Sequence, residues 1–309
     1  MNRFRVAVVC AALLLVTSRP AACEPAGFAF LEVPAGARAS ALGGAFGSLA
    51  QGVEAAFWNP AGLDGVKGVQ MMGSHVEFAQ KLRHDQVALA GRRFGGGLAV
   101  SLRALYSEPI EERDELGNLL GSFGAHDLEF ALAYGHAVAG GLSLGGTAQV
   151  VRERIADASA TTYAFGLGGT WAPPGLGGVR FGASAHNLGP ATHFDIEGAP
   201  GSDVALPAAV QAGGSYERAL PRGATLRGAL EGRFTRGRSG VGMLGLEVAT
   251  ATGPAGSGAL RAGYRFNDDA TGFSVGAGYS FQALRLDYAF VPLRLDLGDT
   301  HRISFTAQF

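Results

Sequence analysis

Apolar and polar residues alternate along most of the chain after residue 68. In the final run, an apolar side chain stands at every odd position from 303 to 309, and Arg, Ser, Thr or Gln stands at each even position from 302 to 308. A period of two is typical of β-strands, whose successive side chains point to opposite faces. Counting every such run predicts about fourteen strands, most of them about ten residues long. They lie near residues 69–78, 85–94, 97–106, 127–136, 142–154, 161–172, 179–187, 207–217, 224–234, 242–249, 259–267, 272–281, 283–292 and 300–309.

Two architectures produce this alternation: a soluble sheet with one wet face, and a membrane barrel with an apolar outside and a polar interior. The second face here is often Gly, Ala, Ser or Thr, which suits a crowded interior better than a wet surface. Runs of this length also match the roughly 9 to 11 residues that cross a bilayer at a tilt, and a closed barrel leaves no edge strands. The sequence therefore predicts an all-β fold, a transmembrane antiparallel β-barrel of about 14 strands. A charge on the lipid face, as in Leu286→Arg, should then be far more damaging than Ser274→Arg at a rim.

The segment between Gly27 and Gly68 lacks the period of two and is rich in Ala and Gly. Residues 53–58 read as a short helix, and residues 59–62 (Asn-Pro-Ala-Gly) read as the turn that stops it. Because the segment is too small to fold alone, we predict that residues 24–68 form a helical hatch inside a barrel spanning residues 69–309. A periplasmic arm or an extra edge element is the alternative. The residues that we expect to define the hatch are Gly36, Arg38, Gly43, Gly44, Trp58, Asn59, Pro60, Ala61 and Gly62.

Residues 1–23 have the layout of a cleaved signal peptide: Arg3 and Arg5, an apolar stretch at 6–16, and small residues before Cys23. The apolar stretch is shorter than the roughly 20 residues that a membrane-spanning helix needs. Export to the outer membrane of a Gram-negative cell follows. Cys23 is either a lipidation site or part of an ordinary cleavage region. Cys10 leaves with the signal peptide, which excludes an intramolecular disulfide.

Composition narrows the class of protein further. Gly makes up 49 of 309 residues and charged residues only 17%, which disfavours an ordinary helical or doubly wound enzyme. The formal net charge is −1, whereas a protein that binds nucleic acid normally carries an excess of basic residues. We expect no cofactor, no metal and no nucleic-acid partner.

Three parts of the chain resemble the PorV/PorQ family of outer-membrane proteins. They are the opening FLEVPAGARASALGGAF at 30–46 with WNPAGL at 58–63, the NLGP at 187–190 followed by Leu206-Pro207, and the closing DLGDTHRIS at 296–304. The resemblance implies a fourteen-stranded barrel akin to the long-chain fatty-acid transporter fold. It also implies a non-enzymatic role in conveying or docking cargo, as in type IX protein secretion. The implied partners are outer-membrane lipid, the barrel-assembly machinery, and either secreted protein cargo or a hydrophobic small molecule.

Two other functions stay open. The fatty-acid transporter likeness favours passive transport of hydrophobic molecules through a lateral opening. A lipid hydrolase would use Ser184 and His186, which share one face of a predicted strand. A pair of polar side chains hydrogen-bonded to each other inside the barrel is the simpler interpretation. The stretch Gly240–Gly245 spells a dinucleotide motif but precedes a strand rather than a helix, and Asn267–Asp269 reads as a hairpin more readily than as a calcium site.

Charged side chains fall on the inward face of the last six predicted strands. Buried charges are costly unless they are paired, so we expect these residues to form one paired network against the hatch. The network would be a polar path or gate, or simply a compensation of buried charge. Its expected members are Arg227, Glu231, Arg233, Glu247, Arg261, Arg265, Arg285 and Asp287. The apolar hatch residues Phe46, Leu49, Phe57 and Trp58 would line a ligand site or fill the hatch, and Phe305 with Phe309 is typical of the closing strand of such barrels.

Overall fold

The computed structural model describes residues 27–309 except 79–80, 197, 251–252, 254–255 and 295–297. The predicted signal peptide and Cys23 lie outside the described residues. In the described part, no helix is long and apolar enough to span a membrane.

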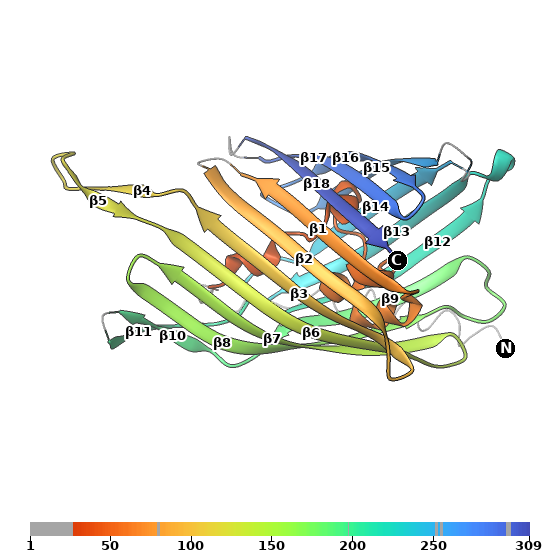
Figure 1. The fold of residues 1–309 in the computed structure, drawn as a ribbon, viewed down its shortest axis with the longest axis horizontal. Coiled ribbons are helices and arrows are strands. Elements are labelled where there is room, and N and C mark those ends of the chain that lie inside the picture. Colours follow the sequence, from red (N-terminus) through yellow and green to blue (C-terminus); the bar gives the residue numbers. More distant parts are fainter. Residues whose placement is uncertain (1–26, 79–80, 197, 251–252, 254–255, 295–297) are drawn as a thin grey trace.

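Fourteen antiparallel strands of the described chain close into one barrel (Figure 1). Each strand pairs with its neighbour around the ring, and the ring closes where the first strand pairs with the last and where β8 pairs with β9. Every predicted run overlaps one of these strands, which confirms the predicted fold class. The barrel strands are β1 (Val69–Glu77), β2 (Leu82–Arg93), β3 (Gly96–Ser107), β6 (Ala125–Ala139), β7 (Leu142–Ile155), β8 (Ala158–Trp171), β9 (Val179–Leu188), β12 (Ala209–Ala219), β13 (Thr225–Thr235), β14 (Val241–Ala249), β15 (Ser257–Phe266), β16 (Phe273–Phe281), β17 (Leu284–Pro292) and β18 (Asp299–Gln308).

The two ends of the barrel differ. At the near end, where Val69 pairs with Phe309, successive strands are joined by turns such as 94–95, 140–141 and 282–283. At the far end, two connections carry hairpins that alternation did not predict, because their strands are short. These are β4 (Ile110–Arg113) with β5 (Leu119–Phe123), and β10 (Thr192–Ile196) with β11 (Ala199–Val204). Both hairpins project from the same end in Figure 1.

The outside of the barrel is apolar and the inside is polar. Leu230 and Leu286 on the outer surface are 63% and 56% exposed, whereas the inward-pointing Glu247 and Asp287 are 2% and 0% exposed. Large apolar side chains continue around the whole outer face, which is the surface that a membrane barrel presents to lipid. The predicted inside and outside faces are therefore correct along these strands.

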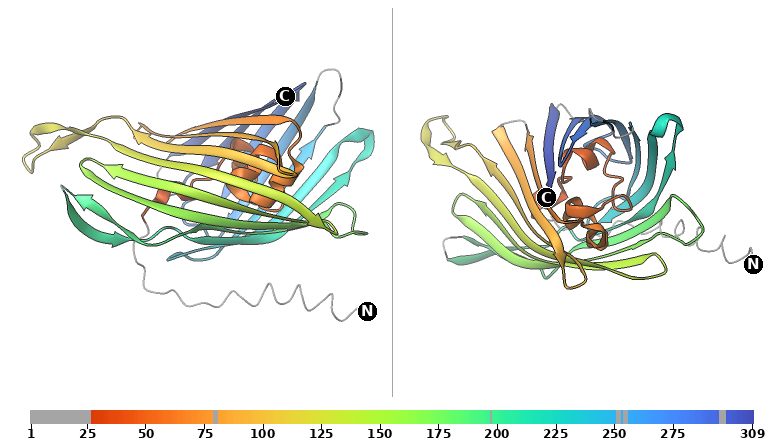
Figure 2. Two further views of the ribbon diagram at one scale, coloured as in Figure 1. Left: turned by 60° about the horizontal axis from the view of Figure 1, so that its bottom comes forward. Right: turned by 45° about the vertical axis from the view of Figure 1, so that its right-hand side comes forward.

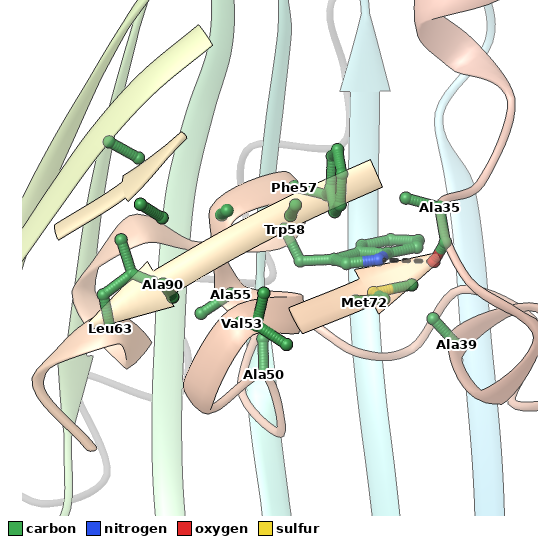
Figure 3. Packing of buried hydrophobic residues seen from close by; sticks show 14 of the residues in the cluster. Ala35, Ala39, Ala50, Val53, Ala55, Phe57, Trp58, Leu63, Met72 and Ala90 are labelled. Carbon is green, nitrogen blue, oxygen red and sulfur yellow. Dashed lines mark hydrogen bonds between the residues drawn. The ribbon is translucent and has the colours of Figure 1, made fainter. Parts of the chain in front are cut away.

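The segment before the barrel folds into short helical turns inside it (Figure 2). These are η1 (Ala29–Glu32), α2 (Ala37–Ala41), η2 (Gly52–Glu54), α3 (Ala55–Trp58) and η3 (Pro60–Gly65); a further turn, η5 (Pro221–Gly223), joins β12 to β13. We call residues 27–68 the hatch. The largest apolar core lies mainly within the hatch and against the inner wall. Trp58 is central to it: its indole Nε1 donates to the Ala35 carbonyl at 2.9 Å and its ring packs edge-on to Phe46 (Figure 3).

Glycines of the wall let the hatch approach the barrel backbone. A Cβ at Gly135 would lie 2.1 Å from the Pro60 carbonyl oxygen, and one at Gly145 would lie 2.5 Å from the Ala61 nitrogen. Real atoms do not approach so closely, so these inward positions require a residue without a side chain. Four such glycines on adjacent strands receive the η3 turn: Gly97, Gly135, Gly145 and Gly168.

Candidate functional site

The Asn-Pro-Ala-Gly turn ties the hatch to the wall. The Asn59 side-chain oxygen accepts from the Ala61 amide at 3.2 Å, and its nitrogen donates to the carbonyls of Gly47 and Gly169 at 3.1 Å each. Pro60 opens η3, where its fixed φ and missing N–H cost nothing. The turn that the sequence indicated thus contacts both the hatch and strand β8.

The hatch glycines serve backbone geometry. Gly36, Gly43 and Gly44 all have positive φ, a conformation that strains other residues. Gly62 has ordinary φ, but a Cβ there would lie 2.1 Å from the Ala50 carbonyl oxygen. These positions shape the hatch rather than contact a ligand directly.

Six charged side chains form a closed ring between the hatch and the wall. Arg38 of the hatch donates to both carboxylate oxygens of Glu247, at 2.9 and 3.0 Å. Arg261 pairs with Glu247 and, at 2.8 Å, with Asp287. Arg285 pairs with Asp287 at 2.8 Å and with Glu54 of the hatch at 2.7 Å, and Glu54 returns to Arg38 at 3.3 Å. The ring alternates in sign, which leaves none of its charges unpaired.

The two hatch members of the ring, Arg38 and Glu54, stay ionised around neutral pH. Burial alone would raise the pKa of Glu54, but the guanidinium groups of Arg285 and Arg38 lower it below its ordinary value. Burial alone would lower the pKa of Arg38, but Glu247 and Glu54 raise it. Because two members come from the hatch and four from the wall, the ring attaches the hatch to β14, β15 and β17.

Five of the eight predicted network residues belong to this assembly. Arg227 joins it through Glu247 at 2.8 Å, and the other four are ring members. The prediction of one network is wrong for the remaining three residues, Glu231, Arg233 and Arg265. Alternation predicts the face of the strand on which a side chain lies, but not its position along the barrel axis. Arg233 stands six residues along β13 from Arg227, about 20 Å at the usual rise per residue.

The three residues outside the ring have separate roles. Glu231 accepts from the backbone amides of Gly47 and Ser48, at 2.9 and 2.7 Å, and so holds a hatch loop. Arg265 pairs with Asp268 at 3.1 Å. Arg233 makes no ion pair within the described residues.

Cavities lie on both sides of the hatch. The far-end vestibule, of about 690 Å³, is bounded by Ala29 and residues 32–34 of the hatch and by the far ends of β13 to β18. Two near-end cavities, of about 700 and 550 Å³, are lined by Arg38, Arg285 and the near-end turns. The hatch and its charged ring separate the two sets.

The barrel wall is interrupted beside strand β8. This strand pairs with β9 as far as Phe165, and with β10 only at Ser159 and Ala158. Among the described residues, 160–164 have no ladder partner on that side, although the other edge of β8 is paired along its whole length with β7. The chain between β9 and β10 passes here through Gly-Pro-Ala at 189–191.

An apolar cluster fills the inside of this interruption. Phe28, Phe30 and Leu31 of the hatch pack against inward side chains of β7 and β8, and all of them are nearly inaccessible to solvent. Phe28 and Leu206 are 0% exposed. The other members of the buried cluster are Val151, Ala160, Ala164 and Val204. The sequence analysis missed this cluster, although the aromatic residues at 28 and 30 were a visible signal.

The remaining sequence candidates fit structural roles. Ser184 Oγ and His186 Nε2 lie 2.8 Å apart, beside a cavity of about 20 Å³ that also contacts Arg103 and Arg233. A substrate does not fit there. Among the described residues, no carboxylate forms a hydrogen bond or ion pair with the His186 imidazole, as a catalytic base would require. Asp268 accepts from the amides of Ala270 and Thr271, at 2.9 and 2.8 Å, as a turn residue does. No metal-binding group of three or more His, Cys, Asp or Glu occurs among the described residues.

The closing strand places its aromatic residues outside. Phe305 and Phe309 are 46% and 77% exposed, and Phe309 exchanges two backbone hydrogen bonds with Val69 at 3.1 and 2.8 Å. Strand β18 therefore closes the ring and presents aromatic rings to the surroundings.

Sequence comparison places this hatched barrel in a family. Residues 5–162, just over half of the chain, match the model described as "Uncharacterised protein family (UPF0164)". The chain belongs to the UPF0164 family. Comparison of this UPF0164 protein with curated proteins gives no match. The family shown is UPF0164, and the resemblance to PorV/PorQ is not confirmed.

Solved structures share the architecture of the UPF0164 chain. The toluene transporter TbuX of Ralstonia pickettii aligns with a TM-score of 0.60 at 12% identity, over 89% of this chain and 98% of its own. The toluene transporter TodX of Pseudomonas putida gives 0.59 at 12% over the same shares. A FadL homologue from Pseudomonas aeruginosa gives 0.53 at 13%, again over 89% and 98%. At such identity the likeness shows the fold alone.

Proposed function

We propose that this UPF0164 protein is a non-enzymatic outer-membrane channel through which hydrophobic small molecules pass passively. The apolar outer face suits lipid, and the near end, with its tight turns, faces the periplasm, as is usual for outer-membrane barrels. A cleaved signal peptide at residues 1–23 would export the chain. The barrel shared with TbuX and TodX, both named as toluene transporters, supports this choice of cargo.

One observation carries the proposal: among the described residues, β8 has no backbone ladder partner at 160–164, where an apolar cluster lines the inner face of the wall. A hydrophobic molecule there meets the apolar side chains of Phe28 and Leu206. A molecule moving along the barrel axis instead meets the ring of six charges that joins the hatch to the wall. Apolar cargo therefore passes sideways between β8 and the β9–β10 segment and enters the membrane.

The vestibule supplies the entrance. Ala29 and residues 32–34 of the hatch line the vestibule. Phe28, Phe30 and Leu31 of the same segment belong to the apolar cluster. Movement of this short segment connects the vestibule to the wall interruption without disturbing the charged ring.

Uptake by Gram-negative cells whose outer membrane excludes toluene tests the function. Cells producing the protein should take up radiolabelled toluene several times faster than cells without it, whereas glycerol uptake should not change. Faster glycerol uptake with unchanged toluene uptake would show an aqueous pore and refute the proposal.

Docking of secreted cargo, the role implied by the PorV/PorQ resemblance, is a second proposal. The β4–β5 hairpin supports it, because Leu116, Leu119 and Leu120 are 87%, 61% and 65% exposed at the far end. Replacing these leucines with Ser should deplete proteins attached to the cell surface and leave toluene uptake unchanged. An unaltered set of surface proteins would exclude this role.

A further inference from the structure

The far-end vestibule carries more arginines than acids. Five arginines line it, on β13, β15, β18 and the β13–β14 loop, against three carboxylates: Arg233, Arg236, Arg238, Arg265 and Arg302 face Glu32, Asp268 and Asp269. Two of the arginines are paired: Arg238 with Glu32 at 2.8 Å and Arg265 with Asp268 at 3.1 Å. The unpaired remainder gives the vestibule a net positive charge.

Two of these arginines, Arg233 and Arg302, lack an ion-pair partner among the described residues, and Arg302 is also buried. Arg302 is 3% exposed. Its guanidinium donates to the hydroxyls of Ser40 and Thr300, at 3.0 and 3.4 Å, and its Cζ lies 6.0 Å from the Phe78 ring. Neither Arg302 nor Arg233 forms an ion pair within the described residues. A buried guanidinium without a counter-charge is costly, and an anion bound in the vestibule would remove that cost.

The apolar residues of the vestibule indicate which kind of chemical group a bound anion would carry beside its charge. Val33, Phe78 and Val241 contribute apolar surface beside the arginines. The volume of about 690 Å³ falls within the range of sites that take a whole organic molecule. A guanidinium is matched to a carboxylate by its planar fork of donors.

We propose that the far-end vestibule binds a small organic acid, with its carboxylate at Arg233 and Arg302 and its apolar part against Val33 and Val241. The protein would then select acids over neutral hydrocarbons of the same size. That the bound acid is cargo rests on the proposed transport, but the binding itself does not.

Equilibrium dialysis of the full chain in detergent micelles tests the site, with radiolabelled benzoate and its neutral counterpart benzamide as probes. Benzoate should bind at least tenfold more tightly than benzamide. Arg233→Gln should weaken benzoate binding at least tenfold, and Arg233→Lys, which keeps the charge but loses the fork, should weaken it less. The matched control is Arg218→Gln, which removes the same charge from an exposed position near the other end of the barrel.

The Arg233 side chain makes no hydrogen bond or ion pair among the described residues, so its replacement should leave the barrel folded. A heat-modifiable gel band verifies this. Equal binding of benzoate and benzamide, or unchanged benzoate binding by Arg233→Gln, would overturn the proposal. Displacement of benzoate by an equal concentration of chloride or inorganic phosphate would also overturn it, because the vestibule would then hold inorganic ions only. A failure of toluene uptake would leave these binding results unaffected, so the two proposals fail separately.

Discussion

Arg38 in the hatch donates to both carboxylate oxygens of Glu247 on β14, at 2.9 and 3.0 Å. The two residues are 209 positions apart in the sequence, so this bidentate contact joins the first folded segment to a strand in the last third of the barrel. It is also the contact on which the closed ring of charges depends. The contact fixes the part of the hatch around Arg38 to the wall, so transport has to avoid the charged ring.

Removal of Arg38 should loosen the hatch. Arg38→Ala leaves Glu247 with Arg261 and Arg227, so we expect a loss near the lower end of the range for a broken buried pair, about 3 kcal/mol. Urea unfolding in micelles, followed by the heat-modifiable gel band, measures it. The control is Arg113→Ala, which removes an exposed pair with Glu111 and should cost less than about 1 kcal/mol. Equal losses for both variants would contradict a stabilising ring.

Acid should weaken the attachment of the hatch. The ring holds the pKa of Glu54 below its ordinary value of 4.5, and a carboxyl with a lowered pKa stabilises the fold above its unfolded value. That stabilisation should be complete above pH 4.5 and decline as the pH falls through the lowered pKa. Fluorescence of Trp58 in a Trp171→Phe background reports the loss, and Glu54→Gln should remove this part of the pH dependence. A hatch that becomes more stable below pH 4.5 would contradict the assignment.

Two adjacent glycines should respond differently to the same change. Gly145 points inward against Pro60 and Ala61, whereas the nearest heavy atom to a Cβ at Gly146 lies 3.7 Å away. Gly145→Ala should cost about 1 to 3 kcal/mol, as overpacking does, and Gly146→Ala should be nearly neutral. Urea unfolding of the two variants compares them directly. Similar behaviour would mean that the hatch does not press on this strand.

Charge on the outer face should be damaging. Leu286 is 56% exposed on β17, and Leu286→Arg should cost about 2 to 4 kcal/mol if lipid covers it at mid-membrane depth. The expectation that Ser274→Arg would be mild is wrong, because Ser274 is 2% exposed and donates to the Ala41 carbonyl of the hatch. The appropriate control is Leu116→Arg at the tip of the β4–β5 hairpin, measured by the same unfolding assay. An equally tolerated Leu286→Arg would place this face in water.

The barrel could be predicted from sequence because the environment of each strand residue follows from its position within that strand. Each barrel strand alternates between lipid and lumen, so residues two apart share an environment, and the pattern appears in all fourteen barrel strands of the described chain. The hatch could be predicted as an exception to the pattern. The hairpins β4–β5 and β10–β11 could not, because their strands are short and their exposed residues have no consistent buried face.

The arrangement inside the lumen required the structure. Alternation placed Arg233 and Arg285 on the same inward face, but a strand pattern carries no information about height along the barrel or about contacts with the hatch. Arg285 therefore joined the ring while Arg233 remained without an ionic partner. Glu54, a ring member, was missed because it lies in the hatch, where no period of two marks its orientation.

Uptake of toluene by cells with bridged cysteines tests the lateral route most directly. In a Cys23→Ser background, one cysteine pair replaces Thr161 and Thr192, whose carbonyl and hydroxyl oxygens lie 3.3 Å apart across the wall interruption. A second pair replaces Ser48 and Glu231, which join hatch to wall at 2.6 Å. Each variant is compared before and after treatment with a short cross-linker that carries two thiol-reactive methanethiosulfonate groups. Each group forms a disulfide with one cysteine and releases methanesulfinate. The lateral route predicts that bridging 161 to 192 reduces toluene uptake to the level of cells without the protein, while bridging 48 to 231 leaves it unchanged. Loss of uptake only when the hatch is bridged would contradict it.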